Sequence, residues 1–241
     1  QAPQTIAMKR DDLDVRSPSI QGPQPPWEQG WTARGLIDVL EPLVVEARAT
    51  RLREVVAQRT LDVTVLFDRP RDPHNGAAVI RSCDAFGVQE LHVLPLVEEF
   101  LVSTRITQGT DRWVDVHEHG SNEAAVEHLE SRGYELILTH PQGALLPEDL
   151  YHLPKVALVL GNEHLGVSPE LSARCRRAVR IPMRGFVESL NVSVSAALLL
   201  SAATRGREGS LSESDRERLY ARGLYRTVTR ADVVLAASRP R

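Results

Sequence analysis

The sequence has only two cysteines, Cys83 and Cys175, and they lie far apart in the chain. A disulfide framework or a zinc ribbon requires closely spaced cysteine pairs, so this spacing argues against both and fits a reducing cytoplasm. No apolar run reaches the roughly 18 residues of a membrane span. The first twenty residues also lack the hydrophobic core of a secretory signal. The sequence therefore predicts a cytoplasmic protein that does not enter a membrane.

Several common site motifs are missing as well. The sequence contains no GxGxxG, no GxxxxGK[ST] and no HExxH, so a dinucleotide-binding fold, a P-loop and a zinc protease have no support. His117 and His119 form an HxH pair, but no third ligand follows at the spacing typical of a metal site. We interpret both as loop histidines and expect no metal.

Lysine is almost absent, since only Lys9 and Lys155 are lysines among 29 basic residues. A coding bias toward arginine explains this, and so does contact with phosphate, because the guanidinium fork matches phosphate oxygens. The net charge of −3 leaves both explanations open. It also means that any affinity for nucleic acid has to come from local patches.

The 241 residues are long enough for one large α/β domain with appendages. Residues 1–33 are rich in Gln, Pro, Asp and Ser and predict a disordered arm. Residues 34–60 carry apolar residues at helical spacing, with a break at Pro42. Strands and helices alternate over residues 61–204. Residues 205–241 predict a helical tail with nine arginines and five acidic residues, a net charge of +4.

Short apolar runs within residues 61–204 predict strands, and amphipathic stretches between them predict helices. The expected strands are 63–67, 90–94, 112–116, 134–140, 155–161 and 178–183, and the expected helices are 75–86, 121–132 and 190–205. Continuous apolar strands separated by helices are typical of a parallel sheet that is buried on both faces. The predicted fold class is therefore α/β, with a mainly parallel sheet and helices on both of its faces.

Three segments each end a predicted strand with polar or glycine-rich sequence: 72–88, 160–170 and 181–200. In open parallel sheets the ligand crevice lies beyond the carboxyl ends of the strands. Each segment alone also has a structural explanation. Asn75 could cap a helix, Arg81 could be a surface residue and Glu163 could pair with an arginine. Ser189 and Asn191 could cap the last helix. The three segments together favour a functional site.

The same segments carry a family resemblance. "PHNGAAVIRSCDAFGV" resembles motif 1 of the SPOUT superfamily of RNA methyltransferases, in which Asn is followed six residues later by Arg. "GNEHLGV" is similar to motif 2, and "IPMRGFVESLNVSVSAALLL" to motif 3. The similarity extends from about Thr50 to Thr204, and within the superfamily it is greatest to the TrmH-type tRNA 2'-O-methyltransferases. It does not cover the arm.

The resemblance implies that the C-terminal part of the domain forms a trefoil knot, a topology that general rules of chain connection do not predict. It also implies S-adenosylmethionine as the cofactor. The family's cofactor contacts fall on residues at the predicted crevice: Thr139, Gly161, Ile181, Met183 and Leu190. Glycine and apolar residues suit an adenine slot with a few fixed polar groups.

The family's catalytic positions carry over as well. The residue that matches the family's activating arginine is Arg81, which we expect to bind a phosphate and stabilise the developing ribose alkoxide. Asn75 is expected to orient Arg81 or the ribose. Glu163 is expected to position the loop, and Ser189 and Asn191 to shape the cofactor and ribose sites. The family also implies a homodimer with two-fold symmetry.

The expected substrate is tRNA, methylated at the D-loop guanosine in position 18. One alternative is ribosomal RNA or another tRNA position, and another is a non-catalytic RNA-binding protein of the same fold. The presence of all five catalytic-type residues counts against the non-catalytic alternative. The expected phosphate contacts are arginines of the N-terminal helical segment and the tail: Arg48, Arg51, Arg53, Arg205, Arg207, Arg216 and Arg218.

Overall fold

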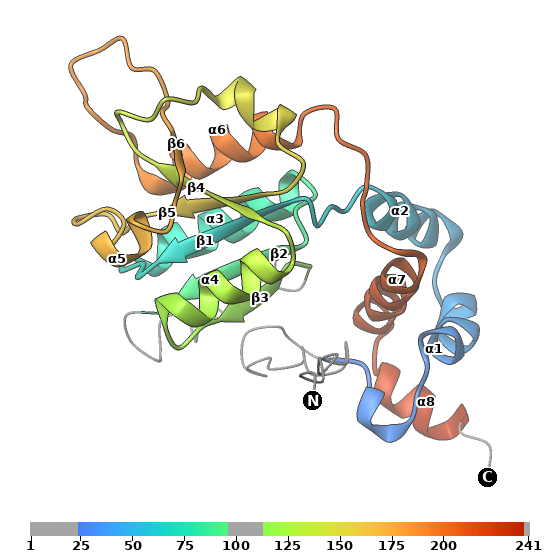
Figure 1. Ribbon diagram of the computed structural model, residues 1–241. Helices are drawn as coiled ribbons and strands as arrows, with labels where there is room; N and C mark the ends of the chain where they lie inside the picture. Colours follow the sequence, from blue (N-terminus) through green and yellow to red (C-terminus); the bar gives the residue numbers. More distant parts are fainter. Residues whose placement is uncertain (1–23, 96–112, 239–241) are drawn as a thin grey trace, which may run out of the picture.

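The computed structural model describes residues 24–95 and 113–238, and its centre is a six-stranded, wholly parallel sheet (Figure 1). The strand order is β3-β2-β1-β5-β4-β6. The strands are β1 (Val63–Asp68), β2 (Glu90–Leu94), β3 (Asp115–Glu118), β4 (Glu135–Thr139), β5 (Val156–Leu160) and β6 (Arg177–Val179). The predicted α/β fold with a parallel sheet is thereby confirmed.

Helices cover both faces of this sheet. The helices α3 (Pro73–Ala85) and α6 (Val192–Thr204) pack together on one face, beside the 3-10 helix η5 (Pro147–His152). The helices α4 (Asn122–Ser131) and α5 (Pro169–Ser172) cover the other face. Alternate residues of β1 enter the two cores, since Val65 packs beneath α3 whereas Leu66 packs beneath α4. This alternation explains why the central strands are apolar along their whole length.

Strand β6 is shorter than the sequence predicts. The prediction extends to Met183, but the strand ends at Val179, which pairs with Thr139, the last residue of the neighbouring β4. Beyond this point β4 offers no partner, and Pro182 has no backbone N–H to donate. The residues from Ile181 onward therefore leave the sheet and belong to the segment that precedes α6.

Four helices from opposite ends of the described chain form a separate layer beside the sheet (Figure 1). They are α1 (Ala33–Leu40), α2 (Glu46–Ala57), α7 (Glu213–Thr227) and α8 (Ala231–Ser238), and we call them the helical unit. Helix α7 packs against α1 and α2, and α8 packs against α1. A 3-10 helix, η3 (Glu41–Leu43), contains Pro42 and separates α1 from α2, as the sequence predicts.

The disordered arm is predicted to extend to residue 33, and this boundary is wrong. Trp27 lies in a 3-10 helix, η2 (Trp27–Gln29), and both Trp27 and Trp31 pack against the apolar core of the helical unit. Large aromatic side chains bury enough apolar surface to order a polar segment. The rest of the predicted arm, residues 1–23, lies outside the described residues.

The trefoil knot that the family resemblance implies stays a prediction.

No helix among residues 24–95 and 113–238 is both long and apolar enough to cross a membrane.

Candidate active site

A cleft of about 600 Å³ lies beyond the carboxyl ends of β4, β5 and β6. All five predicted cofactor residues line it: Thr139, Gly161, Ile181, Met183 and Leu190. The predicted catalytic residues Glu163, Ser189 and Asn191 line it too. The structure thus brings together residues from three loops that are far apart in the sequence.

A chain of hydrogen bonds joins these loops through Asn75. The Asn75 amide Nδ2 donates to Glu163 Oε1 at 2.9 Å, and Asn191 Nδ2 donates to Asn75 Oδ1 at 3.0 Å. Asn75 does not cap its helix, because the Asp72 carboxylate caps α3 by accepting from the His74 N–H. The buried Asn75 side chain is therefore available to link motif 1 to motifs 2 and 3.

Asn191 has two roles in this arrangement. Its Oδ1 accepts from the Ser193 N–H at 2.8 Å and so caps α6, while its Nδ2 holds Asn75. The cap that the sequence suggests is present, and the other end of the same amide belongs to the site. One side chain thereby connects the start of α6 to the start of α3.

Among the described residues, Glu163 forms no ion pair with an arginine side chain, although the sequence left such a pair open. It accepts hydrogen bonds from Asn75 and from the backbone N–H groups of Arg71 and Asp72, at 3.2 and 3.3 Å. Burial alone raises the pKa of Glu163, but these hydrogen bonds to the carboxylate outweigh it and leave the pKa below its ordinary value. Glu163 is thus held as an anion that fixes the loop before α3.

The loop after β5 is shaped by close backbone contact. A Cβ added at Gly161 would lie 2.2 Å from the carbonyl carbon of Gly166, so only glycine fits there. Gly166 itself has φ of 69°, the left-handed region that glycine favours. Apolar side chains such as Ile181, Met183 and Leu190 face this backbone across the cleft. An apolar slot edged by backbone donors and acceptors fits an adenosine group, so the residues present suit S-adenosylmethionine.

Two of the predicted catalytic residues, Asn75 and Arg81, do not line the cleft, but Asn75 is hydrogen-bonded to Glu163 and Asn191, which do. Arg81 is placed differently. It lies on α3, is exposed, and is not among the residues that line the cleft. Six residues of helix separate it from Asn75, a rise of about 9 Å. Its predicted action on the ribose therefore stays a proposal that depends on how the RNA lies over α3.

Side chains that the sequence prediction missed also contribute. Asn162 Nδ2 donates to the Arg69 carbonyl, and its Oδ1 accepts from the N–H groups of His164 and Leu165. It thereby ties the loop after β5 to the loop after β1. His140 and His164 line the cleft. The sequence did contain a signal for Asn162, His140 and His164, because each of them lies at or just after the end of a predicted strand.

The predicted RNA-contacting arginines do not share one environment. Arg53 pairs with Glu41 and Glu46 and stacks on the Tyr220 ring, and Arg51 pairs with Glu54. Arg207 donates to five backbone carbonyls: those of Ala203, Leu150, Tyr151, Leu153 and Pro154. Its guanidinium holds α6 against η5. This structural role explains the presence of an arginine at position 207 without any contact to RNA.

The prediction that His117 and His119 are loop histidines is wrong for His117, which lies within β3, whereas His119 is in the loop that directly follows this strand. With His92 and His128 they form a histidine cluster whose neighbouring rings lie 5.0 to 6.1 Å apart. Burial holds the pKa of His92 well below its usual range and lowers that of His119 to about 4. Within the described ranges, no group of three or more His, Cys, Asp or Glu side chains could hold a metal ion.

Residues 62–201, more than half of the chain, match the SpoU rRNA Methylase family. The chain belongs to this family. A SpoU-family relative, the tRNA (guanosine(18)-2'-O)-methyltransferase of Aquifex aeolicus, is 34% identical over 200 residues, which is 79% of this chain and 94% of the relative. The resemblance predicted from the three motifs is thereby confirmed.

Solved structures agree with this SpoU assignment. The A. aeolicus TrmH/SpoU tRNA modifying enzyme superposes with a TM-score of 0.67 at 31% identity, over 77% of this chain and 98% of that one. The SpoU methyltransferase AviRb from Streptomyces viridochromogenes, in complex with AdoMet, gives a TM-score of 0.56 at 30% identity. That match covers 63% of this chain and 60% of AviRb.

Proposed function

We propose that the protein methylates a ribose 2'-hydroxyl of tRNA, with S-adenosylmethionine as the methyl donor, and that the target is the guanosine at position 18. The observation that carries this proposal is the Glu163–Asn75–Asn191 chain, which joins the three family motifs around one cleft. The similarity to a tRNA (guanosine(18)-2'-O)-methyltransferase over most of both chains supports the choice of substrate.

The proposed roles follow from where the side chains lie. S-adenosylmethionine supplies the methyl group when it is bound. Gly161, Ile181, Met183 and Leu190 would hold the adenosine, with Thr139 at the end of β4 beside them.

The substrate ribose enters from the side of Asn75 and Ser189. Asn75 orients the ribose by the amide that Glu163 and Asn191 hold in place. Arg81 binds an adjacent RNA phosphate and stabilises the negative charge that develops on the 2'-oxygen. Arginine suits this role as a fixed cation, because its guanidinium is protonated in proteins.

The tRNA body lies on the arginines of the helical unit. Arg48, Arg205 and Arg216 are exposed on or beside it, and Arg218 stacks over Trp27. Each phosphate neutralised releases counterions, so binding weakens steeply with salt. The proposed compartment is the cytoplasm, where tRNA is available.

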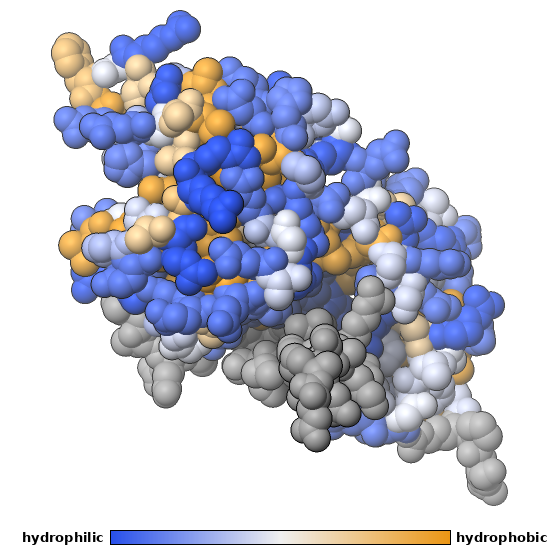
Figure 2. Space-filling model, in the orientation of Figure 1, coloured by the Kyte–Doolittle hydropathy of each residue, from blue (hydrophilic) through white to orange (hydrophobic). Residues whose placement is uncertain are grey.

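A homodimer is the proposed assembly. Val194 and Leu198 are each 46% exposed and lie four residues apart on α6, so they form an apolar stripe on one face of that helix. The segment before α6 projects from the body and exposes hydrophobic residues, which Figure 2 shows at the upper left. An isologous contact along α6 would cover the stripe. Light scattering of the protein and of Leu198→Asp tests this.

The test of the proposed function is incubation with labelled S-adenosylmethionine and unmodified tRNA transcript, followed by mapping of the methylated nucleotide. Label at the ribose of guanosine 18 supports the proposal. Label at another position of the tRNA, or label only in ribosomal RNA that is offered in a parallel incubation, would change the assigned target and keep the same methyl-transfer chemistry. A protein that binds S-adenosylmethionine and RNA but transfers no methyl group overturns the enzyme assignment.

A further inference from the structure

Within the described residues, the helical unit and the sheet meet at a hinge, at a polar contact, and at Trp113, which precedes β3 and packs against the core of the helical unit. The hinge is where the chain segments 58–62 and 205–211 cross between them side by side. Ser210 lies at its centre, since its N–H donates to the Arg59 carbonyl and its Oγ accepts from the Leu61 N–H at 2.8 Å. A Cβ added at Gly209 would lie 1.9 Å from the Ala57 carbonyl oxygen, so the two segments are in close contact.

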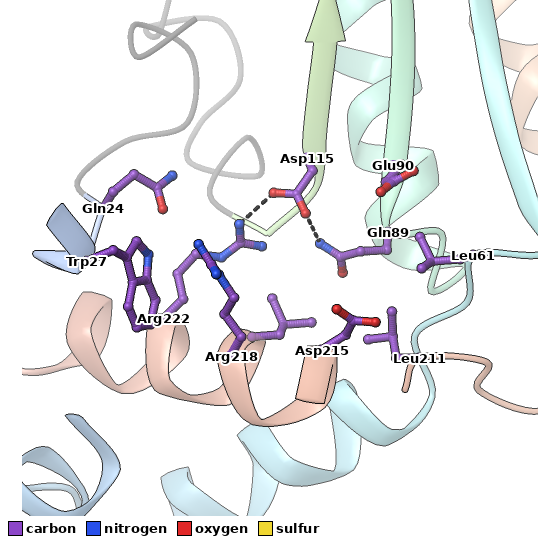
Figure 3. A pocket seen from close by; sticks show the side chains of 11 residues that line it. Gln24, Trp27, Leu61, Gln89, Glu90, Asp115, Leu211, Asp215, Arg218 and Arg222 are labelled. Carbon is purple, nitrogen blue, oxygen red and sulfur yellow. Dashed lines mark hydrogen bonds and ion pairs between the residues drawn. The ribbon is translucent and has the colours of Figure 1, made fainter. Parts of the chain in front are cut away.

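The second place is a polar contact between α7 and the edge of the sheet, which we call the latch. Arg222 of α7 donates from Nη1 to Asp115 Oδ1 at 2.5 Å, and Gln89 Nε2 donates to Asp115 Oδ2 at 3.0 Å. Asp115 begins β3 and Gln89 precedes β2, so the guanidinium contacts β3 directly and is linked to the start of β2 through Asp115. Figure 3 shows Arg222 rising from α7 to Asp115, with Gln89 on its other side.

The latch is buried but not tightly packed. Arg222 is 6% exposed and Gln89 3%, yet Arg222 Nε and Gln89 Oε1 have no hydrogen-bond partner among the described residues. Both residues line a cavity of about 100 Å³ (Figure 3). Such a space holds about three waters at ~30 Å³ each, and polar walls favour them.

A small polar contact permits movement between two bodies, whereas a large apolar one does not. Besides the hinge, the single aromatic side chain of Trp113 packs on the helical unit, and this contact is small enough to permit rotation about the crossing segments. A second attachment away from the hinge fixes that angle. The charged pair is suited to this task, because removing one partner leaves the other charge buried and uncompensated.

We infer that Arg222, together with Asp115 and Gln89, is a positioning residue for the RNA. It holds the helical unit at the angle at which the arginines of that unit and the cleft engage one tRNA molecule. This inference rests on the proposed function. The latch lies at the amino ends of β2 and β3, whereas the cleft lies at the carboxyl ends of the strands, so Arg222 acts through orientation and not by contact with the ribose.

The experiment compares the variants Arg222→Gln, Arg222→Lys and Asp115→Asn with the wild type on a full-length tRNA transcript and on a short D-arm hairpin. For Arg222→Gln the KM for tRNA should rise about tenfold, the size of an ordinary coupling between two sites. The kcat, the KM for the hairpin and the affinity for S-adenosylmethionine should stay within about twofold of wild type. Arg222→Lys keeps the charge and should recover part of the loss.

The matched control is Arg34→Gln, which removes one positive charge from an exposed ion pair with Asp38 on α1. It should change the KM for tRNA much less than Arg222→Gln does. An equal change would show that only the charge of the helical unit matters.

A second measurement follows the angle directly. Spin labels at Ser214→Cys on α7 and Glu127→Cys on α4, in a Cys175→Ser background, report the distance between the two bodies. The distribution should be narrow in the otherwise wild-type protein and broad with Arg222→Gln.

An unchanged distribution together with an unchanged KM overturns the inference, and so does an equal loss on the hairpin. If the wild type methylates no tRNA, the proposed function fails, and the spin labels still test the latch.

Discussion

Replacing Asn75 by Asp tests the hydrogen-bond chain at the centre of the site. The substitution keeps the size of the side chain and the acceptor for Asn191 Nδ2, but it turns the donor to Glu163 Oε1, now 2.9 Å away, into a second carboxylate. Two carboxylates at such a distance cannot both ionise without a large cost. We expect the pair to share one proton.

The magnitude follows from the geometry. Two unit charges about 4 Å apart at an effective dielectric constant of about 20 repel by about 4 kcal/mol, and the partial exposure of Glu163 reduces this to about 2 kcal/mol. For a domain of this size each kcal/mol shifts the unfolding temperature by about 2–4 °C. The repulsion should therefore lower the Tm of Asn75→Asp by about 4–8 °C at pH 8, in addition to the loss of the hydrogen bond.

The sign of the pH dependence is fixed by the shared proton. One carboxyl of the pair has its pKa raised in the folded protein, so the folded state binds more protons than the unfolded state and loses stability as the pH rises. The penalty should be small near pH 4–5 and complete at pH 8. Asn75→Ala removes the same hydrogen bonds without adding a charge and is the matched control.

The assay is thermal unfolding of the two variants and the wild type from pH 4.5 to 8. If the difference in Tm between Asn75→Asp and Asn75→Ala is the same across this range, Glu163 is not held as an anion against Asn75. The electrostatic account of the site would then be wrong.

Three further predictions concern separate parts of the molecule. Arg81→Ala should keep the fold and the affinity for S-adenosylmethionine while lowering single-turnover methyl transfer by about 10²–10³-fold; near-normal transfer would refute its role. Gly161→Ala should weaken S-adenosylmethionine binding measured by calorimetry, because the added Cβ meets Gly166 at 2.2 Å; unchanged affinity would show that the loop yields without cost. The buried His92 and the half-buried His119 have lowered pKa values, about 4 for His119, so the folded protein should lose stability as the pH falls from about 6.5 toward 4. His119→Gln should make that loss shallower in acid unfolding, and an unchanged slope would place the titration elsewhere.

The sheet was predictable from sequence because it follows a repeating rule. Buried parallel strands need apolar residues on both faces, and β1 and β5 show this directly. The cofactor cleft was predictable for a related reason, since Thr139, Gly161 and Ile181 each lie in the carboxyl-terminal part of a predicted strand. The family motifs then supplied the roles of these residues.

Other features depend on contacts between distant segments, which a local pattern does not record. The sequence does not distinguish Arg207 from Arg48, since both lie in arginine-rich helical segments. In the structure the Arg207 guanidinium donates hydrogen bonds to backbone carbonyls, whereas Arg48 is exposed. The pairing of α1 with α7 could not be read from either helix alone. The histidine cluster was missed because His92 and His117 become neighbours only when β2 pairs with β3.

The helical unit is built from both ends of the described chain, and this has a consequence for folding during synthesis on the ribosome. Helices α1 and α2 are complete by residue 57, but α7, which covers Leu36, Leu40 and Leu52, begins only at residue 213, so positions 58–212, or 155 residues, come between them. At about 5–20 residues per second the ribosome needs roughly 8 to 30 s for that stretch. During this interval the leucines of α1 and α2 stay uncovered while the sheet beside them folds. The nascent protein therefore exposes an apolar surface that is prone to association until α7 has been synthesised.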